Sequence, residues 1–303
     1  MGQQNTKPKT HISKTQIIGI IGVGLMGRGI AINVQKQGWD IGFLDHPGNQ
    51  PTVDLENAGA KKHSSLAELA SASDVIVLCV TGTPQVEAIM AGEGGLLANI
   101  NSGAFIIDCS TAIPNSTIAL AKQVKGIGCT MLDAPMTRTA KEAAEGRLNL
   151  IVGGDKEAFE YVHPLLEAFA ENISYAGASG AGHKMKLLHN YVSLGFLAVL
   201  GEAAASAKRG NVDPKIFTDI LASGGGASVA LERMKPFIVE GDNTGLQFSI
   251  ANACKDIGYY LQMAEDLGAT TNGAEGLIAT FEEALEKSND QAYVPEIADI
   301  LSK

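Results

Sequence analysis

Apolar, β-branched residues form a series of short, almost uninterrupted runs through the first half of the chain, at residues 16–22, 39–45, 74–80, 104–109, 129–132 and 148–152. Runs of this length and composition are typical of strands whose two faces are both buried. Segments with helical periodicity lie between most of them, at residues 25–37, 83–90, 115–125 and 156–170. Alternating strands and helices predict an α/β fold with a doubly wound, mainly parallel sheet.

The pattern changes after residue 176. A glycine- and alanine-rich break at residues 177–182 precedes a long helical segment that runs to about residue 208. Strand signals are then nearly absent, and further helical segments follow at residues 213–221, 229–239, 249–267, 273–286 and 295–301. We therefore predict two domains: a sheet-containing domain over residues 16–176 and an all-helical second domain over residues 177–303.

Composition narrows the class of protein. Apolar residues make up 45% and charged residues 18% of the 303 residues, which supports buried cores and argues against disorder. The net charge of -10 disfavours nonspecific phosphate binding, so we expect no nucleic-acid partner. A local cationic pocket for a small anion remains compatible with that charge.

Cysteine and histidine spacing indicates neither a disulfide framework nor a metal site. The chain has no CxxC pair and no HExxH pattern among its cysteines (Cys79, Cys109, Cys129 and Cys254) and histidines. We therefore expect free thiols in a reducing, cytoplasmic compartment, and no metal. The sequence has no apolar signal-peptide core and no uninterrupted apolar run of about 18 residues, so we expect no membrane partner. Gly2 and Thr6 fit a loose myristoylation pattern, but we favour an unmodified polar tail.

The first apolar run ends in a GxGxxG turn, Gly22-Val23-Gly24-Leu25-Met26-Gly27, which also opens a helix. In a Rossmann-type domain these glycines allow a tight turn, close approach of a pyrophosphate and close packing of helix on strand. The helix N-terminus offers N–H groups and a positive dipole end to the phosphates. The pattern predicts a dinucleotide site, and the alternative interpretation is a glycine-rich turn without a ligand.

Asp45 ends the second apolar run, about 20 residues beyond the glycines. A carboxylate at this position can accept hydrogen bonds from both hydroxyls of the adenosine ribose and would repel a 2′-phosphate. No arginine follows it, and His46 is the nearest group that could complicate the assignment. We predict NAD as the cofactor in preference to NADP. The alternative for Asp45 alone is a turn residue at a strand end.

The segment IGVGLMGRGIAINV resembles the opening of the β-hydroxyacid dehydrogenases, the relatives of 3-hydroxyisobutyrate dehydrogenase. Further blocks agree with that family in order and spacing, over about residues 16–300. They are Asp108-Cys109-Ser110-Thr111 with Pro114, Asp133-Ala134-Pro135, Gly180-Ala181-Gly182-His183-Lys184-Met185-Lys186 with Asn190, and Lys255-Asp256. The resemblance implies hydride transfer between a nicotinamide and the carbon that carries an alcohol.

By that resemblance Lys186 is the catalytic lysine and Asn190 is its neighbour. The two residues are at positions i and i+4 and so share one face of a helix, which Lys184 does not share. A lysine there can donate a proton to the developing alkoxide during reduction and remove it during oxidation. The asparagine would hold the substrate or the lysine.

The resemblance also places four residues at the cofactor. Leu25 and Met26 line its site, Thr111 faces the nicotinamide end, and Lys255 reaches the cofactor or the substrate from the helical domain. The alternative interpretations are helix packing for Leu25 and Met26, a turn hydroxyl for Thr111, and a helix-surface charge for Lys255.

One block departs from the family. Most members have Ser-Gly-Gly after the Asp-Ala-Pro step, where the serine and backbone N–H groups bind the substrate carboxylate, whereas this chain has Met136-Thr137-Arg138-Thr139. Thr137 can replace the serine hydroxyl, and Arg138 adds a planar cation suited to a carboxylate, sulfonate or phosphate. The branch that reduces sulfolactaldehyde is similar here, with a Gly-Arg-Thr run. The alternative is a solvent-facing arginine, with the ordinary substrates unchanged.

We therefore predict an NAD-dependent oxidoreductase that acts on a short anionic 3-hydroxy acid, similar to 3-hydroxyisobutyrate, or on its aldehyde or ketone. Thr137, Arg138, Asn190 and Lys255 are the predicted substrate-binding residues. A sulfolactaldehyde reductase-like enzyme is the alternative substrate class. A non-catalytic dinucleotide-binding interaction protein is the alternative of another kind. The glycine- and alanine-rich helices of the second domain predict a homo-oligomer.

Overall fold

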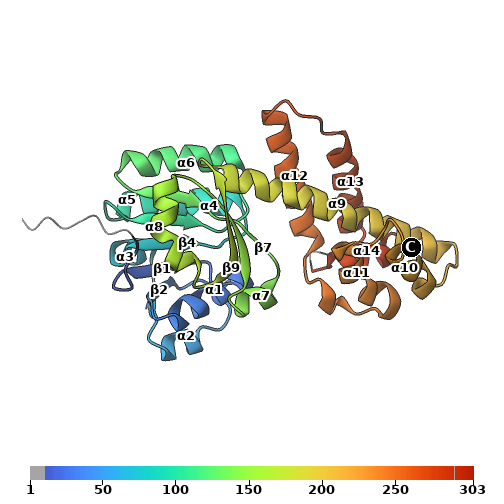
Figure 1. The fold of residues 1–303 in the computed structure, drawn as a ribbon, viewed down its shortest axis with the longest axis horizontal. Coiled ribbons are helices and arrows are strands. Elements are labelled where there is room, and N and C mark those ends of the chain that lie inside the picture. The colour runs from blue at the N-terminus through green and yellow to red at the C-terminus, as the bar shows by residue number, and fades with distance from the viewer. Residues whose placement is uncertain (1–10, 290) are drawn as a thin grey trace, which may run out of the picture. The chain divides into compact units, whose positions relative to one another are not determined.

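The computed structural model describes residues 11–289 and 291–303, and the chain divides into two compact units (Figure 1). Unit 1 is Met1–Lys186 and unit 2 is Leu187–Lys303. The myristoylation pattern at Gly2 and Thr6 lies outside the described residues.

Within residues 11–186, unit 1 contains a sheet of nine strands with flanking helices, which confirms the predicted fold class. Six strands pair in parallel in the order β3-β2-β1-β4-β5-β6, the order of a doubly wound dinucleotide-binding fold. They are β1 (Ile17–Ile21), β2 (Asp40–Leu44), β3 (Lys61–His63), β4 (Val75–Leu78), β5 (Phe105–Asp108) and β6 (Thr130–Asp133).

Three further strands extend this sheet beyond β6. β7 (Met136–Thr137) follows β6, and both pair antiparallel with β8 (Leu148–Gly153), which pairs in parallel with β9 (Ala170–Gly177). The apolar pattern does not reveal β3 or β9, because most of their side chains are exposed, and β7 is only two residues long. The expected helix over residues 156–170 therefore ends earlier, at Leu166.

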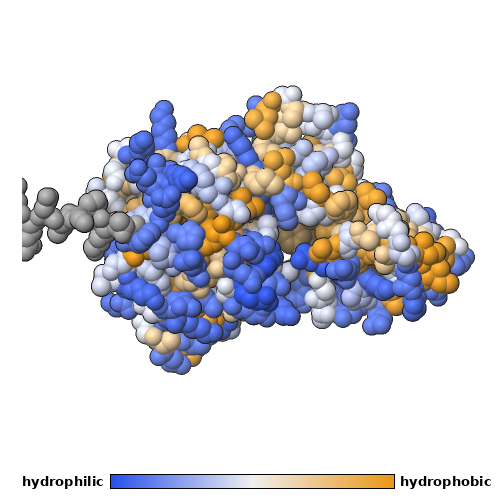
Figure 2. All heavy atoms as spheres, viewed as in Figure 1, coloured by the Kyte–Doolittle hydropathy of each residue, from blue (hydrophilic) through white to orange (hydrophobic). Residues whose placement is uncertain are grey.

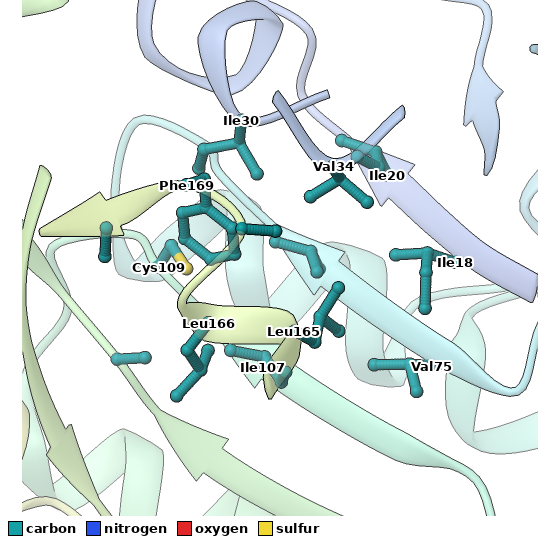
Figure 3. Close-up of a cluster of buried hydrophobic side chains, with 14 of the residues drawn as sticks. Ile18, Ile20, Ile30, Val34, Val75, Ile107, Cys109, Leu165, Leu166 and Phe169 are labelled. Carbon is teal, nitrogen blue, oxygen red and sulfur yellow. The ribbon is translucent and has the colours of Figure 1, made fainter. Parts of the chain in front are cut away.

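Helices cover both faces of the sheet in unit 1. They are α1 (Leu25–Lys36), α2 (Val53–Asn57), α3 (Leu66–Ala72), α4 (Thr83–Ala91), α5 (Leu96–Asn99), α6 (Pro114–Gly126), α7 (Ala140–Ala144) and α8 (Lys156–Leu166). Figure 3 shows one of the two cores, where Ile30 and Val34 of α1 and Leu165 and Leu166 of α8 surround Phe169 and the strand residues. The other face of the sheet is packed against α3, α4, α5 and α6.

Unit 2 is helical, as the sequence pattern predicts, and its core includes Leu197, Ile257 and Phe281. Its helices are α9 (Ala181–Arg209), which begins in unit 1, α10 (Pro214–Ala222), α11 (Val229–Glu240), α12 (Ile250–Asp266), α13 (Asn272–Glu286) and α14 (Ile297–Ile300), with 3-10 turns η1 (Asn243–Gly245) and η2 (Val294–Glu296).

The two compact units divide inside α9, between Lys186 and Leu187. The reason is that the first turn of α9 is bonded to unit 1. The buried carboxylate of Asp133, at the end of β6, accepts hydrogen bonds from the backbone N–H groups of Gly180 (2.8 Å) and His183 (3.0 Å).

By length and composition α9 is the one helix within the described ranges that could cross a membrane, and 44% of its apolar 18-residue stretch is buried. Leu194, Leu197 and Ala198 of α9 lie in the core of unit 2, and a core helix of this kind has the same composition.

Candidate active site

The glycine turn joins β1 to α1 and is shaped by two glycines. Gly22 has a φ of 92°, and a Cβ on it would overlap the carbonyl oxygen of Cys79. A Cβ on Gly27 would overlap the carbonyl oxygen of Gly22. By contrast, a Cβ on Gly24 would meet nothing within 4 Å. Gly22 and Gly27 are therefore required by the turn itself, whereas the space beside Gly24 is open to a ligand.

The N-terminus of α1 is suited to an anion. Its N-cap residue, Gly24, makes no side-chain capping bond, and the first N–H groups of a helix have no partner within the helix. Leu25 in the first turn is 67% exposed, while Met26 packs partly against the core. An exposed leucine beside an uncapped helix N-terminus fits a surface that a dinucleotide would cover.

The loop after β2 is tied to this turn by Asn49, which the sequence analysis did not single out. The side-chain amide of Asn49 donates to the carbonyl oxygen of Leu44 (2.9 Å) and accepts from the N–H of Val23 (3.3 Å). The N–H of Gln50 donates to the carbonyl oxygen of Val23 (2.8 Å). These bonds hold the end of β2, and with it Asp45, beside the glycine turn.

Asp45 has a cationic neighbour at this end of the site. The Nζ of Lys62, on β3, lies 3.5 Å from a carboxylate oxygen of Asp45, and both side chains are about half exposed. His46 accepts a hydrogen bond from the N–H of Gly48 through Nδ1. Parallel pairing of β2 and β3 brings Lys62 to Asp45, so sequence spacing alone gives no sign of this pair.

A buried polar cluster shapes the loop after β5, which carries Thr111. The carboxylate of Asp108 accepts from the N–H of Ser110 (2.9 Å), and the Ser110 hydroxyl accepts from the N–H of Val80 (3.0 Å). Burial raises the pKa of the Asp108 carboxyl, and the nearby imidazole of His183 opposes that rise. The cluster fixes the carboxyl ends of β4 and β5 relative to each other.

His183 links the same loop to the start of α9. The imidazole is fully buried, with Nε2 3.0 Å from the carbonyl oxygen of Ser110 and Nδ1 2.7 Å from the hydroxyl of Thr117. With the two bonds to Asp133, these contacts set the first turn of α9 on the sheet. Lys186 lies less than one turn beyond His183, so they also set the origin of its side chain.

Thr137 and Arg138 lie where β7 ends. The hydroxyl of Thr137 accepts a hydrogen bond from Nδ2 of Asn149 (3.2 Å). Arg138 has a φ of 81°, a conformation that favours glycine, and its Nη1 donates to Glu171 and to the carbonyl oxygen of Arg147. Sequence spacing gives no sign of this ion pair, because Glu171 is brought close to Arg138 by β9.

Unit 2 contributes a second polar group, centred on Asp256 of α12. Its buried carboxylate accepts from Nδ2 of Asn190 (2.6 Å) and forms an ion pair with Lys255 (3.1 Å). The Nζ of Lys255 also lies 5.6 Å from the ring centre of Tyr259. Asp256 thus joins two of the predicted site residues, Asn190 and Lys255.

The predicted residues therefore form three groups. The glycine turn and Asp45 lie together in unit 1, Thr137 and Arg138 lie together at the end of β7, and Asn190 and Lys255 lie together in unit 2. The helix α9 carries both Lys186 and Asn190. Across residues 11–289 and 291–303, no set of three or more His, Cys, Asp or Glu side chains is placed to hold a metal ion.

Two protein-family models match consecutive parts of the chain. The NAD-binding domain of 6-phosphogluconate dehydrogenase matches residues 17–177, and the NAD-binding domain of NADP-dependent 3-hydroxyisobutyrate dehydrogenase matches residues 180–297. The fold and the glycine turn therefore define a dinucleotide-dependent oxidoreductase.

Similar proteins narrow this class. The chain is 32% identical over 257 residues to 2-(hydroxymethyl)glutarate dehydrogenase of Eubacterium barkeri, covering 84% of each chain. It is 33% identical over 262 residues to NAD-dependent L-serine dehydrogenase of Pseudomonas aeruginosa, covering 85% of each. The crystal structure of 3-hydroxyisobutyrate dehydrogenase from Salmonella typhimurium matches with a TM-score of 0.83 and 25% identity, over 94% of this chain and 99% of that one.

The protein belongs to the β-hydroxyacid dehydrogenases related to 3-hydroxyisobutyrate dehydrogenase. This confirms the predicted family, the predicted class of NAD-dependent enzyme acting on CH–OH groups, and the predicted dinucleotide cofactor.

Proposed function

We propose that this dehydrogenase acts on a short anionic 3-hydroxy acid or its aldehyde, with Lys186 as the acid/base. The observation that carries the proposal is the position of Lys186 one helical turn before Asn190, whose amide is held by the buried Asp256. The relatives support the substrate class, since they are named for 2-(hydroxymethyl)glutarate, L-serine and 3-hydroxyisobutyrate.

The chain's own residues have distinct tasks in this proposal. Bound NAD supplies the acceptor for the hydride of the alcohol carbon. Lys186 takes the hydroxyl proton during oxidation and returns it during reduction, and Asn190 and Lys255 orient the substrate. Thr137 donates to the anionic head, and Thr111 lies towards the nicotinamide. Leu25, Met26 and the uncapped N–H groups after Gly24 hold the dinucleotide.

A screen of short acids tests the proposal. Purified protein with NAD would be assayed by NADH absorbance against 3-hydroxyisobutyrate, L-serine, L-threonate, 2-(hydroxymethyl)glutarate and 2,3-dihydroxypropane-1-sulfonate. We expect measurable turnover of at least one carboxylate, and ethanol and glycerol serve as uncharged controls. Turnover of the sulfonate alone would favour the sulfolactaldehyde reductase-like alternative. Turnover of the uncharged alcohols alone would overturn the anionic-substrate proposal. A protein that binds NADH but turns over no substrate of the panel would favour the non-catalytic alternative.

Arg138 is proposed to contact the anionic head of the substrate. Within the described part of the chain, Nη1 is the only nitrogen of Arg138 that has an acceptor, so three guanidinium N–H groups remain for an anion. Arg138→Ala should raise KM by about tenfold and leave kcat nearly unchanged, because the head group is charged in both ground and transition states. Arg138→Lys should rescue only partly.

Glu171→Gln is the matched control for the arginine variants, because it weakens the ion pair and keeps the guanidinium. Steady-state kinetics of the three variants would be compared on the best acid of the screen. An unchanged KM in Arg138→Ala would show that this arginine only ties β7 to β9.

The preference for NAD over NADP is proposed to reside in Asp45. The wild-type protein should have the higher kcat/KM with NAD(H), because the carboxylate repels a 2′-phosphate. Asp45→Ser should reduce this preference by about tenfold, since Lys62 then faces the ribose without its ion-pair partner. Asp40→Ser, at the other end of β2, is the control. Equal kcat/KM values for both cofactors in the wild type would refute the assignment.

We also propose a homo-oligomer in a reducing, cytoplasmic compartment, where the four free cysteines remain thiols. Val192, Phe196 and Val199 follow one face of α9 and are 56%, 56% and 61% exposed. Figure 2 shows hydrophobic surface over this part of unit 2, which a second copy of the chain would cover. Phe196→Glu should lower the mass measured by analytical ultracentrifugation, whereas Gln262→Glu on α12 should not. A monomeric wild type would overturn this assignment.

A further inference from the structure

A polar ladder crosses the three strands at the edge of unit 1. Thr137 of β7 lies opposite Asn149 of β8, which lies opposite Asn172 of β9. Nδ2 of Asn172 donates to Oδ1 of Asn149 (2.8 Å), and Nδ2 of Asn149 donates to Oγ1 of Thr137 (3.2 Å). The two hydrogen bonds therefore run in one direction, from Asn172 towards Thr137.

The sheet fixes the position of this ladder. Met136, Leu148 and Leu150, which precede or flank the ladder residues, belong to the hydrophobic core. Successive side chains of a strand point to opposite faces, so Thr137 and Asn149 lie on the face away from that core. A slip of one residue would bury Asn149 and expose the leucines, which makes the observed register strongly preferred.

The direction of the ladder determines what Thr137 can do. A threonine hydroxyl has one proton to donate and two lone pairs that accept. Since one lone pair accepts from Asn149, the proton of Thr137 must point elsewhere. Within the described residues the Thr137 hydroxyl makes no other hydrogen bond, so its proton remains for a ligand. A carboxylate or sulfonate only accepts hydrogen bonds, and a donor in this orientation matches it.

We infer that Asn149 is a positioning residue, which orients the Thr137 hydroxyl as a donor to an anionic oxygen of the substrate. The inference rests on the proposed function, in which Thr137 binds the anionic head. Asn149 acts without touching the substrate: Asn172 fixes the carbonyl of its amide, and this leaves the NH2 group facing Thr137. In this arrangement the sheet, rather than the substrate, determines where the hydroxyl proton points.

Asn149→Asp tests the direction of the ladder. A carboxylate at residue 149 accepts the Thr137 proton and so removes the donor from the substrate. KM for the best acid of the screen should rise about tenfold, the scale of one lost hydrogen bond to a charged group, while kcat changes by less than about twofold. Asn149→Leu, which neither donates nor accepts, should raise KM only about threefold. The dissociation constant of NADH should be unchanged in both variants.

Thr137→Val separates this inference from the proposed function. If Thr137→Val leaves KM unchanged, Thr137 does not bind the head group and the proposed role fails. If it raises KM, Asn149→Asp is combined with Thr137→Val in a double variant. If Asn149 acts by orienting the Thr137 hydroxyl, Asn149→Asp should not raise KM further in the double variant. Simple charge repulsion by the new carboxylate would instead raise KM in the double variant as well. An equal rise in KM with and without Thr137→Val would overturn the inference and leave the role of Thr137 intact.

Asn172→Asp is a second test of the direction of the ladder, for use if the Asn149→Asp protein does not fold. Residue 172 is exposed, and a carboxylate there would accept from Nδ2 of Asn149 and turn that amide over. The carbonyl of Asn149 would then face Thr137 and take its proton. KM should rise again, and only in protein that has Thr137. A rise of the same size in protein that also carries Thr137→Val, or no rise in a folded protein, would contradict the ladder.

Discussion

Lys186→Ala is expected to lower kcat by about 100-fold or more, because a correctly positioned acid/base contributes on the order of 10²–10⁴ to the rate. Cofactor affinity should change little, since the lysine acts at the reacting carbon. The substitution should also leave the fold intact, because alanine is the best helix former and Lys186 lies within α9. The measurements are steady-state turnover and NADH binding by fluorescence.

Lys184→Ala is the matched control. It lies two residues earlier on the same helix and therefore on a different face. Near-normal turnover in Lys186→Ala together with a large loss in Lys184→Ala would show that the acid/base had been assigned to the wrong lysine.

The second large effect is expected at the glycine turn, where one glycine-to-alanine substitution should weaken NADH binding and another should lower stability. Gly24→Ala should fold normally, because its Cβ meets nothing within 4 Å, but it should weaken NADH binding by about tenfold or more by occupying the space for the pyrophosphate. Gly27→Ala should instead destabilise unit 1 by about 3 kcal/mol, because its Cβ overlaps the carbonyl oxygen of Gly22.

Thermal unfolding and NADH titration of both variants distinguish the two effects. Gly276→Ala, inside α13 with open space around it, is the control and should stabilise the protein by up to about 1 kcal/mol. Normal NADH affinity in Gly24→Ala would show that the glycine turn is not part of the cofactor site.

The sequence predicts those parts of the fold that depend on local patterns. The buried strands are visible as apolar runs, and the GxGxxG turn is recognisable because its glycines lie close together in the chain. β9 could not be predicted in the same way, because its side chains are mostly exposed. Largely exposed strands of this kind acquire their structure from the partner strand to which they bond.

The same distinction between local and long-range contacts applies to the candidate site. Lys186 and Asn190 could be paired from their spacing, since a helix makes positions i and i+4 neighbours. The contacts of Asn49 with Val23, of Lys62 with Asp45 and of Asn149 with Thr137 could not. Each of them joins strands or loops that are brought together only by the sheet.

The course of α9 has a consequence for the geometry of the proposed catalytic pair, Lys186 and Asn190. A boundary between compact units usually lies in an exposed linker, but here it lies within an unbroken helix, between Lys186 and Leu187. The spacing of Lys186 and Asn190, about 6 Å along the axis, is thus set by the backbone hydrogen bonds of one helix. One residue inserted between them would rotate Asn190 by about 100° and separate the two side chains, although both units would keep their own folds. The proposed acid/base and its neighbour thus owe their spacing to the stiffness of a single helix.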